Sequence, residues 1–246
     1  MTIGHGPLFL KHMTPGAVRN QLTIDPRLII PVGTTEQHGP HLPLGCDTVI
    51  VERLADDLSA EFRVLRAPTI EYGVNAPTIV SYPGSASVRR KTLHRFLNDL
   101  IGSWEAGGVT RFIIITAHGQ DPHQEALTTL HTRRATVRTV DVFAVPLESV
   151  DAAYHEPVHG GEVDTSLMLY IDAERVQVDK SRDYEPERRT IRRYHRGARG
   201  AIPGSSPGSL GSPSSATSAK GEQIYQTIYE RIAGRLFRTP RTEDAQ

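Results

Sequence analysis

Three short segments of the chain concentrate histidine and carboxylate side chains, which can bind metal ions or move protons. They read TTEQHGPHLPLGCD, AHGQD and HEPVHGGEVD. The donors that they supply are Glu36, His38, His41 and Asp47, then His118, then His155, His159, Glu162 and Asp164. Nitrogen and oxygen donors without thiolates suit zinc, manganese or iron, and a carboxylate can bridge two such ions. The residue types therefore favour a site for two metals.

Short apolar runs precede these segments and predict the strands that position them. Residues 27–32 (RLIIPV) end at Gly33, and residues 112–116 (FIIIT) form the most strand-like run in the chain. Two more strands are predicted over 64–70 and 139–145. Helices are predicted from Asp47 or Thr48 to about residue 62, over about 88–106, from Asp121 onward, and over about 217–237.

Strands that alternate with helices predict parallel pairing with helices on both faces of the sheet. The expected fold is a single-domain three-layer α/β/α sandwich with a mostly parallel sheet, covering residues 1–246. Ligands of such sheets bind beyond the carboxyl ends of the strands. The three polar segments follow predicted strands, so we expect them to meet at that edge.

Each of these residues also has an ordinary structural interpretation. A single histidine in a loop is more often a surface or hydrogen-bonded residue than a ligand. Carboxylates before helices, such as Asp47, Asp121 and Asp164, are commonly caps. The convergence of three separate segments on one edge nevertheless favours a metal or acid–base site.

Composition narrows the class of protein. Lysine plus arginine and aspartate plus glutamate number 28 each, so no net charge attracts nucleic acid or an anionic membrane. No run of about 18 apolar residues and no secretion leader is visible, so we expect a cytoplasmic protein. The single cysteine, Cys46, excludes an intramolecular disulfide and is expected to be a small buried side chain.

The segment at about 195–218 is rich in glycine, proline and serine and shows no apolar periodicity. We expect a long loop there rather than a packed element. Two interpretations stay open for it. It is either a surface excursion or a functional lid or subunit-contact arm, because long loops inside compact domains often have such roles.

Several motifs resemble those of the creatininase family. The most specific is PVGTTEQHGPHLPLGCDT, which is similar to that family's first signature. YPGS at 82–85, AHGQD, HGGEVDTS and ATSAKGEQ follow in the family's order. The matches span about residues 25–236, which is nearly the whole chain. The resemblance implies a creatininase-like fold and a metal-dependent amidohydrolase.

The resemblance also implies roles for single residues. Glu36 and His118 would hold one metal, His38 and an acid the other, and Asp47 would bridge them. Creatininase takes that acid from two residues after the loop histidine, where this chain has Gln120, so Glu162 is predicted instead. The further expectations are His159 with Glu162 as catalytic residues and Tyr82, Gln120 and Asp121 as substrate-binding residues. The cofactors would be two divalent metal ions, with zinc expected first and manganese or iron as alternatives.

The expected substrate is a small molecule with a carbon–nitrogen bond other than an ordinary peptide bond, such as a cyclic amide or a formamide. Creatinine itself is not favoured, because Trp104 is the only tryptophan and lies on a predicted core-facing helix. A peptidase that trims a small modified peptide and a non-catalytic metal-binding or ligand-binding protein remain alternatives. A serine hydrolase is disfavoured because no GxSxG motif follows a strand. The resemblance further implies a homo-oligomer, with a hexamer as the family's usual form.

Overall fold

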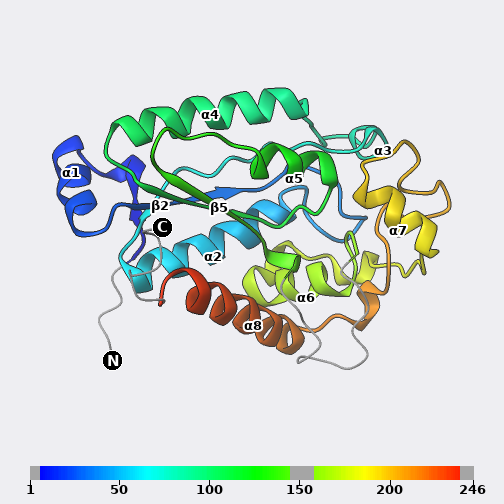
Figure 1. Cartoon of the computed structure of the whole chain (residues 1–246). Coiled ribbons are helices and arrows are strands. Elements are labelled where there is room, and N and C mark those ends of the chain that lie inside the picture. Colours follow the sequence, from blue (N-terminus) through cyan, green and yellow to red (C-terminus); the bar gives the residue numbers. More distant parts are fainter. Residues whose placement is uncertain (1–5, 145–157, 239–246) are drawn as a thin grey trace.

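One parallel β-sheet forms the middle layer of the computed structural model, which describes residues 6–144 and 158–238 (Figure 1). The strands are β1 (Leu8–Phe9), β2 (Arg27–Val32), β3 (Leu65–Arg66), β4 (Arg111–Thr116) and β5 (Thr136–Asp141). Their order across the sheet is β1-β3-β2-β4-β5, and every neighbouring pair is parallel. The central pair, β2 and β4, is in register from Arg27 opposite Arg111 to Val32 opposite Thr116.

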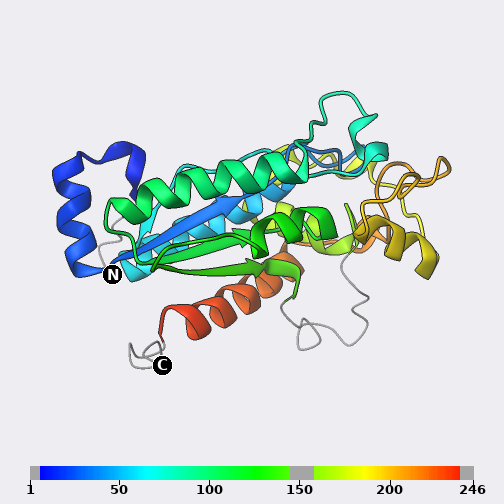
Figure 2. The ribbon, with the colours of Figure 1, turned by 45° about the horizontal axis from the view of Figure 1, so that its top comes forward.

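Helices cover both faces of this sheet, with α4 and α5 on one side and α2, α6 and α8 on the other (Figures 1 and 2). The α-helices are α1 (Pro15–Ile24), α2 (Cys46–Phe62), α3 (Pro77–Val80), α4 (Arg90–Ala106), α5 (Asp121–Thr128), α6 (Glu162–Ile171), α7 (Arg188–His195) and α8 (Ser218–Leu236). Short 3₁₀ helices lie at Leu10–His12, Val142–Ala144, Ala173–Arg175, Val178–Lys180 and Pro213–Ser215. None of the described helices combines the length and hydropathy that a membrane span requires.

Side chains alternate between the two faces of β2, so this strand contributes to a separate apolar core on each face of the sheet. Leu28, Ile30 and Val32 pack in the cluster that contains the buried residues of α4 and α5. Ile29 points to the opposite face and joins the cluster formed with α2, α6 and α8. A strand that is buried on both faces reads as a continuous apolar run, as RLIIPV does. The predicted three-layer sandwich is confirmed.

Several predicted elements needed correction at their ends. The predicted strand at 64–70 is shortened to β3, because Pro68 lacks the N–H that a central strand donates; only Ile70 pairs again, with Val32. The predicted strand at 139–145 instead begins at Thr136 and ends at Asp141. Residue 145 itself lies outside the described residues. The helices α1, α3 and α7 were not predicted from the sequence, and α6 was implied only by the cap interpretation of Asp164.

The segment at 195–218 is not a surface excursion. It has almost no regular structure, as expected, but Ala201, Ile202 and Leu210 are buried in a third apolar cluster with Tyr194 of α7. Its backbone also contacts the polar segments: Leu210 N–H donates to the carbonyl of His159 at 2.8 Å. The segment is therefore a packed cover over part of the sheet edge.

Candidate metal centre and active site

Five side chains from the three polar segments meet beyond the carboxyl ends of β2 and β4. Glu36 and His38 follow β2, His118 follows β4, Asp47 lies in the first turn of α2, and His159 precedes α6. All five are buried, with at most 3% of each residue exposed. The predicted convergence of separate segments is therefore what the fold produces, because parallel strands end at the same edge.

Asp47 lies between two histidines. Its Oδ1 is 3.1 Å from Nε2 of His38, and its Oδ2 is 3.3 Å from Nδ1 of His118. Glu36 Oε1 is 3.1 Å from the same His118 nitrogen and 3.7 Å from His38 Nε2. A carboxylate with one oxygen toward each imidazole has the geometry of a bridging ligand. The cap interpretation of Asp47 does not hold, since the residue before α2 is Gly45 and no side chain caps it.

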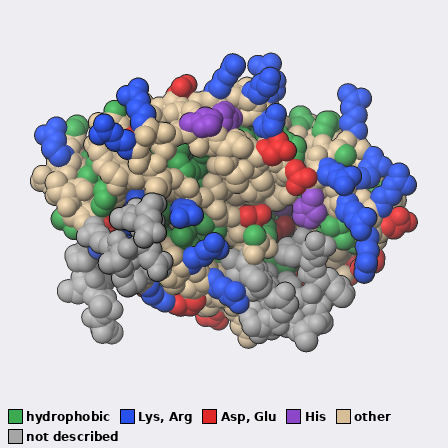
Figure 3. Space-filling model, in the orientation of Figure 1, with side chains coloured by type: hydrophobic (Ala, Val, Ile, Leu, Met, Phe, Trp, Pro, Cys, Tyr) green, Lys and Arg blue, Asp and Glu red, His purple; other side chains and the backbone are tan. Residues whose placement is uncertain are grey.

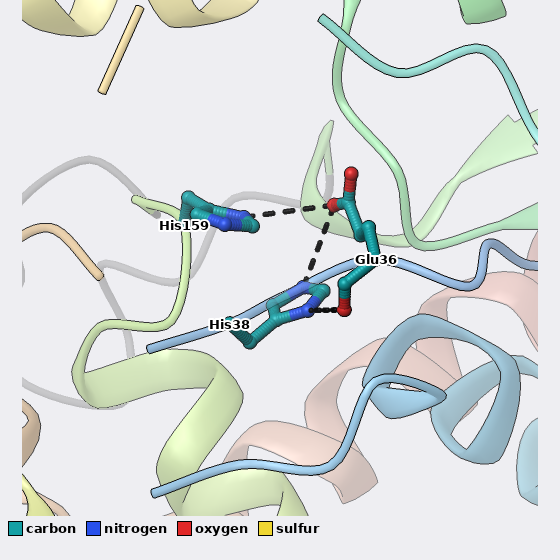
Figure 4. A group of neighbouring side chains, drawn as sticks. All are labelled: Glu36, His38 and His159. Atoms are coloured by element: carbon teal, nitrogen blue, oxygen red, sulfur yellow. Dashed lines mark hydrogen bonds and ion pairs between the residues drawn. The ribbon is translucent and has the colours of Figure 1, made fainter. Parts of the chain in front are cut away.

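His159 completes the group from a different element. In Figure 4 the side chains of Glu36, His38 and His159 point toward one another. His159 Nδ1 is 3.6 Å from Glu36 Oε1, and the His159 and His38 rings have their centroids 4.3 Å apart. His159 therefore lies in the same cluster as His38 and His118, the two histidines predicted to bind metal.

One ring nitrogen of His38 and one of His118 are hydrogen-bonded to backbone carbonyls, which leaves the other nitrogen of each ring available to bind a metal. His118 Nε2 lies 3.0 Å from the carbonyl oxygen of Val74, and His38 Nδ1 lies 3.1 Å from that of Glu36. A carbonyl only accepts, so these nitrogens each carry a hydrogen, and His118 Nδ1 and His38 Nε2 are the nitrogens that face the carboxylates. Metal-ligating histidines are typically held in this way by their second nitrogen.

The donor set fits divalent metal ions. Both carboxylate oxygens of Glu36 are buried and accept no hydrogen bond from the described residues. Ligand atoms within 4.8 Å of one another form three groups: Glu36 with Asp47 and His118, Glu36 with His38 and His159, and His38 with Cys46 and Asp47. Burial and nearby carboxylates raise the pKa of the Cys46 thiol, which disfavours its thiolate form and its use as a ligand. The first group contains both buried carboxylates, with His118 Nδ1 3.1 Å from Glu36 Oε1 and 3.3 Å from Asp47 Oδ2.

The electrostatics of the cluster suit a bound cation. Burial disfavours a charge on His118, yet the Glu36 carboxylate raises the pKa of His118 well above its usual value. Burial acts likewise on His38, but Asp47 raises the pKa of His38 to about 9. Buried carboxylates thus retain protons on both imidazoles. A divalent cation between the same atoms would take the place of these protons.

A cavity of about 160 Å³ opens beside the cluster. His38, Asp47 and His159 line it from the metal side, and Tyr194 and His195 of α7 line it from the other. Sequence reasoning missed both α7 residues, since an arginine-rich stretch without apolar periodicity carries no motif. Lys and Arg side chains gather at the end of the molecule where α7 lies (Figure 3).

Two acidic side chains also line the cavity, Asp141 at the end of β5 and Asp164 in the first turn of α6. Burial raises the pKa of Asp164 to about 7, and its Oδ2 accepts a hydrogen bond from the Gly160 N–H at 2.8 Å. Burial also raises the pKa of Asp141. The sequence singled out Asp164 as a donor of the third segment, whereas nothing marked Asp141, because single acids at strand ends are common.

Glu162 does not lie in the cluster. Its Oε1 is 2.5 Å from Nζ of Lys220 in α8, and its side chain is 25% exposed. The helix geometry explains this, because Glu162 and Asp164 are two residues apart in the first turn of α6 and point to different sides. The acid of this segment that lines the cavity is Asp164. The ligand role of Glu162 stays a prediction.

The predicted substrate-binding residues are dispersed. Gln120 is buried and its Oε1 accepts a hydrogen bond from Ala76 N–H at 2.8 Å. Asp121 is exposed at the start of α5, and Tyr82 lies in the turn after α3; neither lines the cavity. His41 is buried against Thr165, with 2.9 Å between His41 Nε2 and Thr165 Oγ1. His155 lies outside the described residues.

Comparisons with known proteins agree with this geometry. The family model described as "Creatininase: Creatinine amidohydrolase" matches residues 11–236. A mycofactocin precursor peptide peptidase of Mycolicibacterium smegmatis is 29% identical over 87% of this chain and 85% of its own length. The creatinine amidohydrolase of Pseudomonas putida is 25% identical over 84% of this chain and 86% of its own.

Solved structures show the same fold. A crystal structure of creatinine amidohydrolase has a TM-score of 0.75 and 21% sequence identity, and the match covers 95% of this chain and 99% of that one. A manganese form of creatininase has a TM-score of 0.73 at 22% identity, covering 95% and 100% of the two chains. The likeness at this identity concerns the fold, and it extends over nearly the full length of both chains.

Proposed function

The chain belongs to the creatininase family, and from this we propose that it is a dinuclear metal-dependent hydrolase that cleaves a non-peptide or modified carbon–nitrogen amide bond of a small molecule. One observation carries the proposal: two buried histidines turn the nitrogens that no carbonyl holds toward Asp47, beside a Glu36 carboxylate that accepts no hydrogen bond from the described residues. Such an arrangement is costly without cations and well suited to them.

The proposed ligands divide between two positions around Asp47. Glu36 and His118 would hold one ion, His38 would hold the other, and Asp47 would bridge them. Zinc is the first candidate, because the solved structures similar to this chain include a zinc–zinc form of a creatininase variant. Manganese and iron are the alternatives. When bound, divalent ions in such sites supply a hydroxide near neutral pH and polarise the scissile carbonyl group.

The chain's own residues would bind and orient the substrate and exclude water. The cavity of about 160 Å³ accommodates a small molecule against His159, Asp164 and Tyr194. His159 is the proposed proton-handling residue, because it is buried beside Glu36 and also lines the cavity. The packed segment at 195–218 closes one side of the site, through contacts such as that of Leu210 with His159.

A second candidate is the trimming of a small modified peptide. It is favoured by the 29% identity to a mycofactocin precursor peptide peptidase over most of both chains. The exposed arginines of α7 (Arg188, Arg189, Arg192 and Arg193) would raise the local concentration of acidic substrates of either kind. A substrate panel should therefore contain acidic and neutral members of each class.

Metal content and a substrate panel test the proposed function. Protein purified without added metal is reloaded with zinc, manganese or iron, its metal per chain is measured, and cyclic amides, formamides and short modified peptides are supplied. We expect about two ions per chain and hydrolysis of at least one class. One ion or none after reloading would count against the dinuclear site, and two ions without hydrolysis would support a non-catalytic family member.

Replacing Glu162 tests whether this residue binds a metal, as the sequence predicted, or only pairs with Lys220, as in the structure. Because the Glu162 carboxylate pairs with Lys220, we expect Glu162→Gln to retain the metal content of the wild type. Elemental analysis of both proteins, purified in parallel, measures this. Lys220→Met is the matched control, since it removes the same ion pair from the other side. Loss of one ion in Glu162→Gln alone would show that Glu162 turns toward the metals when they bind.

The assembly is proposed to be a homo-oligomer, with the hexamer first, and the family resemblance is the basis for this. Light scattering coupled to size-exclusion chromatography measures the mass directly. A monomer of 27.1 kDa at micromolar concentration would contradict the proposal.

A further inference from the structure

Gln37 lies between the two proposed ligands Glu36 and His38, and its side-chain amide has a fixed orientation. Gly39 N–H donates to Gln37 Oε1 at 2.8 Å, and Gln37 Nε2 donates to the carbonyl oxygen of Gly208 at 2.9 Å. Turning the amide over would place oxygen against oxygen and N–H against N–H. The Nε2 group of Gln37 therefore faces its third neighbour, Nε2 of His159, at 3.0 Å.

This contact determines where His159 carries its hydrogen. An amide N–H only donates, so His159 Nε2 must accept and must hold a lone pair. A neutral imidazole then has its hydrogen on Nδ1. His159 consequently differs from His38 and His118, whose hydrogens point away from the carboxylates. The Nδ1 atom of His159 faces the site and carries a hydrogen, so this nitrogen is poorly suited to bind a metal.

The acceptor for this hydrogen is the hydroxyl of Tyr194. His159 Nδ1 is 3.0 Å from Tyr194 Oη, closer than its 3.6 Å to Glu36 Oε1. The two rings also pack together, with centroids 4.8 Å apart. Burial raises the pKa of this phenol well above its usual value.

Tyr194 Oη thus accepts the hydrogen bond from His159 Nδ1–H, and its own hydrogen is left to be donated. Tyr194 lines the cavity, and no further acceptor for its hydroxyl is found within residues 6–144 and 158–238. Burial keeps the phenol in its neutral O–H form. A phenol that accepts from a histidine is a stronger donor than an isolated one, because hydrogen bonds in a chain polarise one another.

We propose that Tyr194 is a further catalytic residue, which donates a hydrogen bond from Oη to the oxygen of the scissile carbonyl group, and that Gln37 is a positioning residue that acts by holding His159 in its Nδ1–H form. No covalent bond to Tyr194 forms and its proton is not transferred. This inference rests on the proposed hydrolysis. Before the reaction His159 thus acts on the carbonyl oxygen through Tyr194, and its proposed proton transfer requires that one of its two hydrogen bonds breaks.

The hydrogen position is testable without any substrate. In protein labelled with ¹⁵N-histidine, long-range proton–nitrogen spectra distinguish the two neutral forms of each ring, and His159→Gln identifies the signal of His159. We expect Nδ1–H in the wild type. Gln37→Glu places a carboxylate oxygen against Nε2 and should move the hydrogen there or protonate both nitrogens. An Nε2–H form in the wild type would overturn the proposal, whether or not hydrolysis has been found.

Kinetics of the metal-loaded protein test the role of the phenol. Tyr194→Phe should lower kcat by about 100-fold, the effect of removing one donor to a developing negative charge, with KM and metal content little changed. Tyr184→Phe is the matched control, because its hydroxyl only meets Ser205 at 3.3 Å, and it should retain wild-type kcat. A wild-type kcat in Tyr194→Phe would exclude the phenol from the reaction.

A double-variant comparison tests the path from Gln37 to Tyr194. Gln37→Met removes the amide without adding a charge, so it guards against an effect of Gln37→Glu on the metals. If Gln37 acts through Tyr194, adding Gln37→Met to Tyr194→Phe should lower kcat little further. Full multiplication of the two effects would show that Gln37 acts elsewhere. Because the spectra need no turnover, failure of the hydrolase proposal and failure of this one are distinguishable.

Discussion

Glu36→Gln is expected to abolish high-affinity metal binding and hydrolysis together. Both Glu36 oxygens are buried and accept no hydrogen bond from the described residues, and Oε1 lies 3.1 Å from His118 Nδ1, so this carboxylate has little to do apart from holding a cation. An amide supplies no negative charge and points two hydrogens into the site. The loss in affinity should exceed the factor of about 100 seen for residues that only support ligands.

Thermal unfolding with and without a chelator measures the same loss independently of any substrate. Ligands that bind only the folded state raise its stability, so chelation should lower the melting temperature of the wild type. The Glu36→Gln protein should melt at the same temperature with and without the chelator. Glu61→Gln is the control, since Glu61 lies near the other end of α2, about 20 Å from Asp47, where it accepts from Tyr229. An undiminished chelator effect in Glu36→Gln would remove Glu36 from the ligand set.

Gly221→Ala is expected to cause the largest loss of stability among single substitutions at glycine in the helices. A Cβ at Gly221 would lie 1.8 Å from the carbonyl oxygen of Ser166 and 2.5 Å from its carbonyl carbon. Both are backbone atoms of α6, so the helices α6 and α8 must move apart to admit a methyl group. Overpacking of this kind costs about 3 kcal/mol, and the same displacement would shift Asp164 at the start of α6.

The midpoint of urea unfolding measures this effect. Gly102→Ala in α4 is the matched control, because a Cβ there meets no atom within 4 Å. Alanine is favoured over glycine in helices, so the control should gain about 0.5–1 kcal/mol. Equal midpoints for Gly221→Ala and the wild type would mean that α6 and α8 pack less closely than the structure shows. Gly221 is the glycine of the ATSAKGEQ motif, and it is required because the close packing of α6 and α8 leaves no room for a side chain.

Gln120 stands at the position where the family resemblance implies an acidic metal ligand. Its Oε1 accepts a hydrogen bond from Ala76 N–H, so this side chain has a structural contact here. No second acid replaces it among the metal groups of the described residues, which contain Glu36 and Asp47 as their only carboxylates. We therefore expect the ion held by His38 to be the weaker of the two.

Much of the fold followed from local patterns. RLIIPV and FIIIT became β2 and β4, and the predicted helix beginning at Asp47 or Thr48 became α2, which starts at Cys46, because apolar periodicity and breakers act within a few residues. The sequence does contain a start signal for the helix α1, because Thr14 caps it by accepting from Ala17 N–H and Pro15 follows in the first turn. The helix α7 had none, because its stability derives from packing Tyr194 against a distant segment.

The sequence by itself determined which donors exist and that they follow strands, and hence that Glu36, His38, Asp47, His118 and His159 come together. Only the tertiary structure decided how each side chain is used. His118 is oriented by the carbonyl of Val74 and Gln37 by that of Gly208, 171 residues away in the chain. Glu162 is oriented by its ion pair with Lys220, which lies in another helix. Strand and loop order is encoded locally, whereas the direction of a hydrogen bond depends on partners that only folding brings within 3 Å.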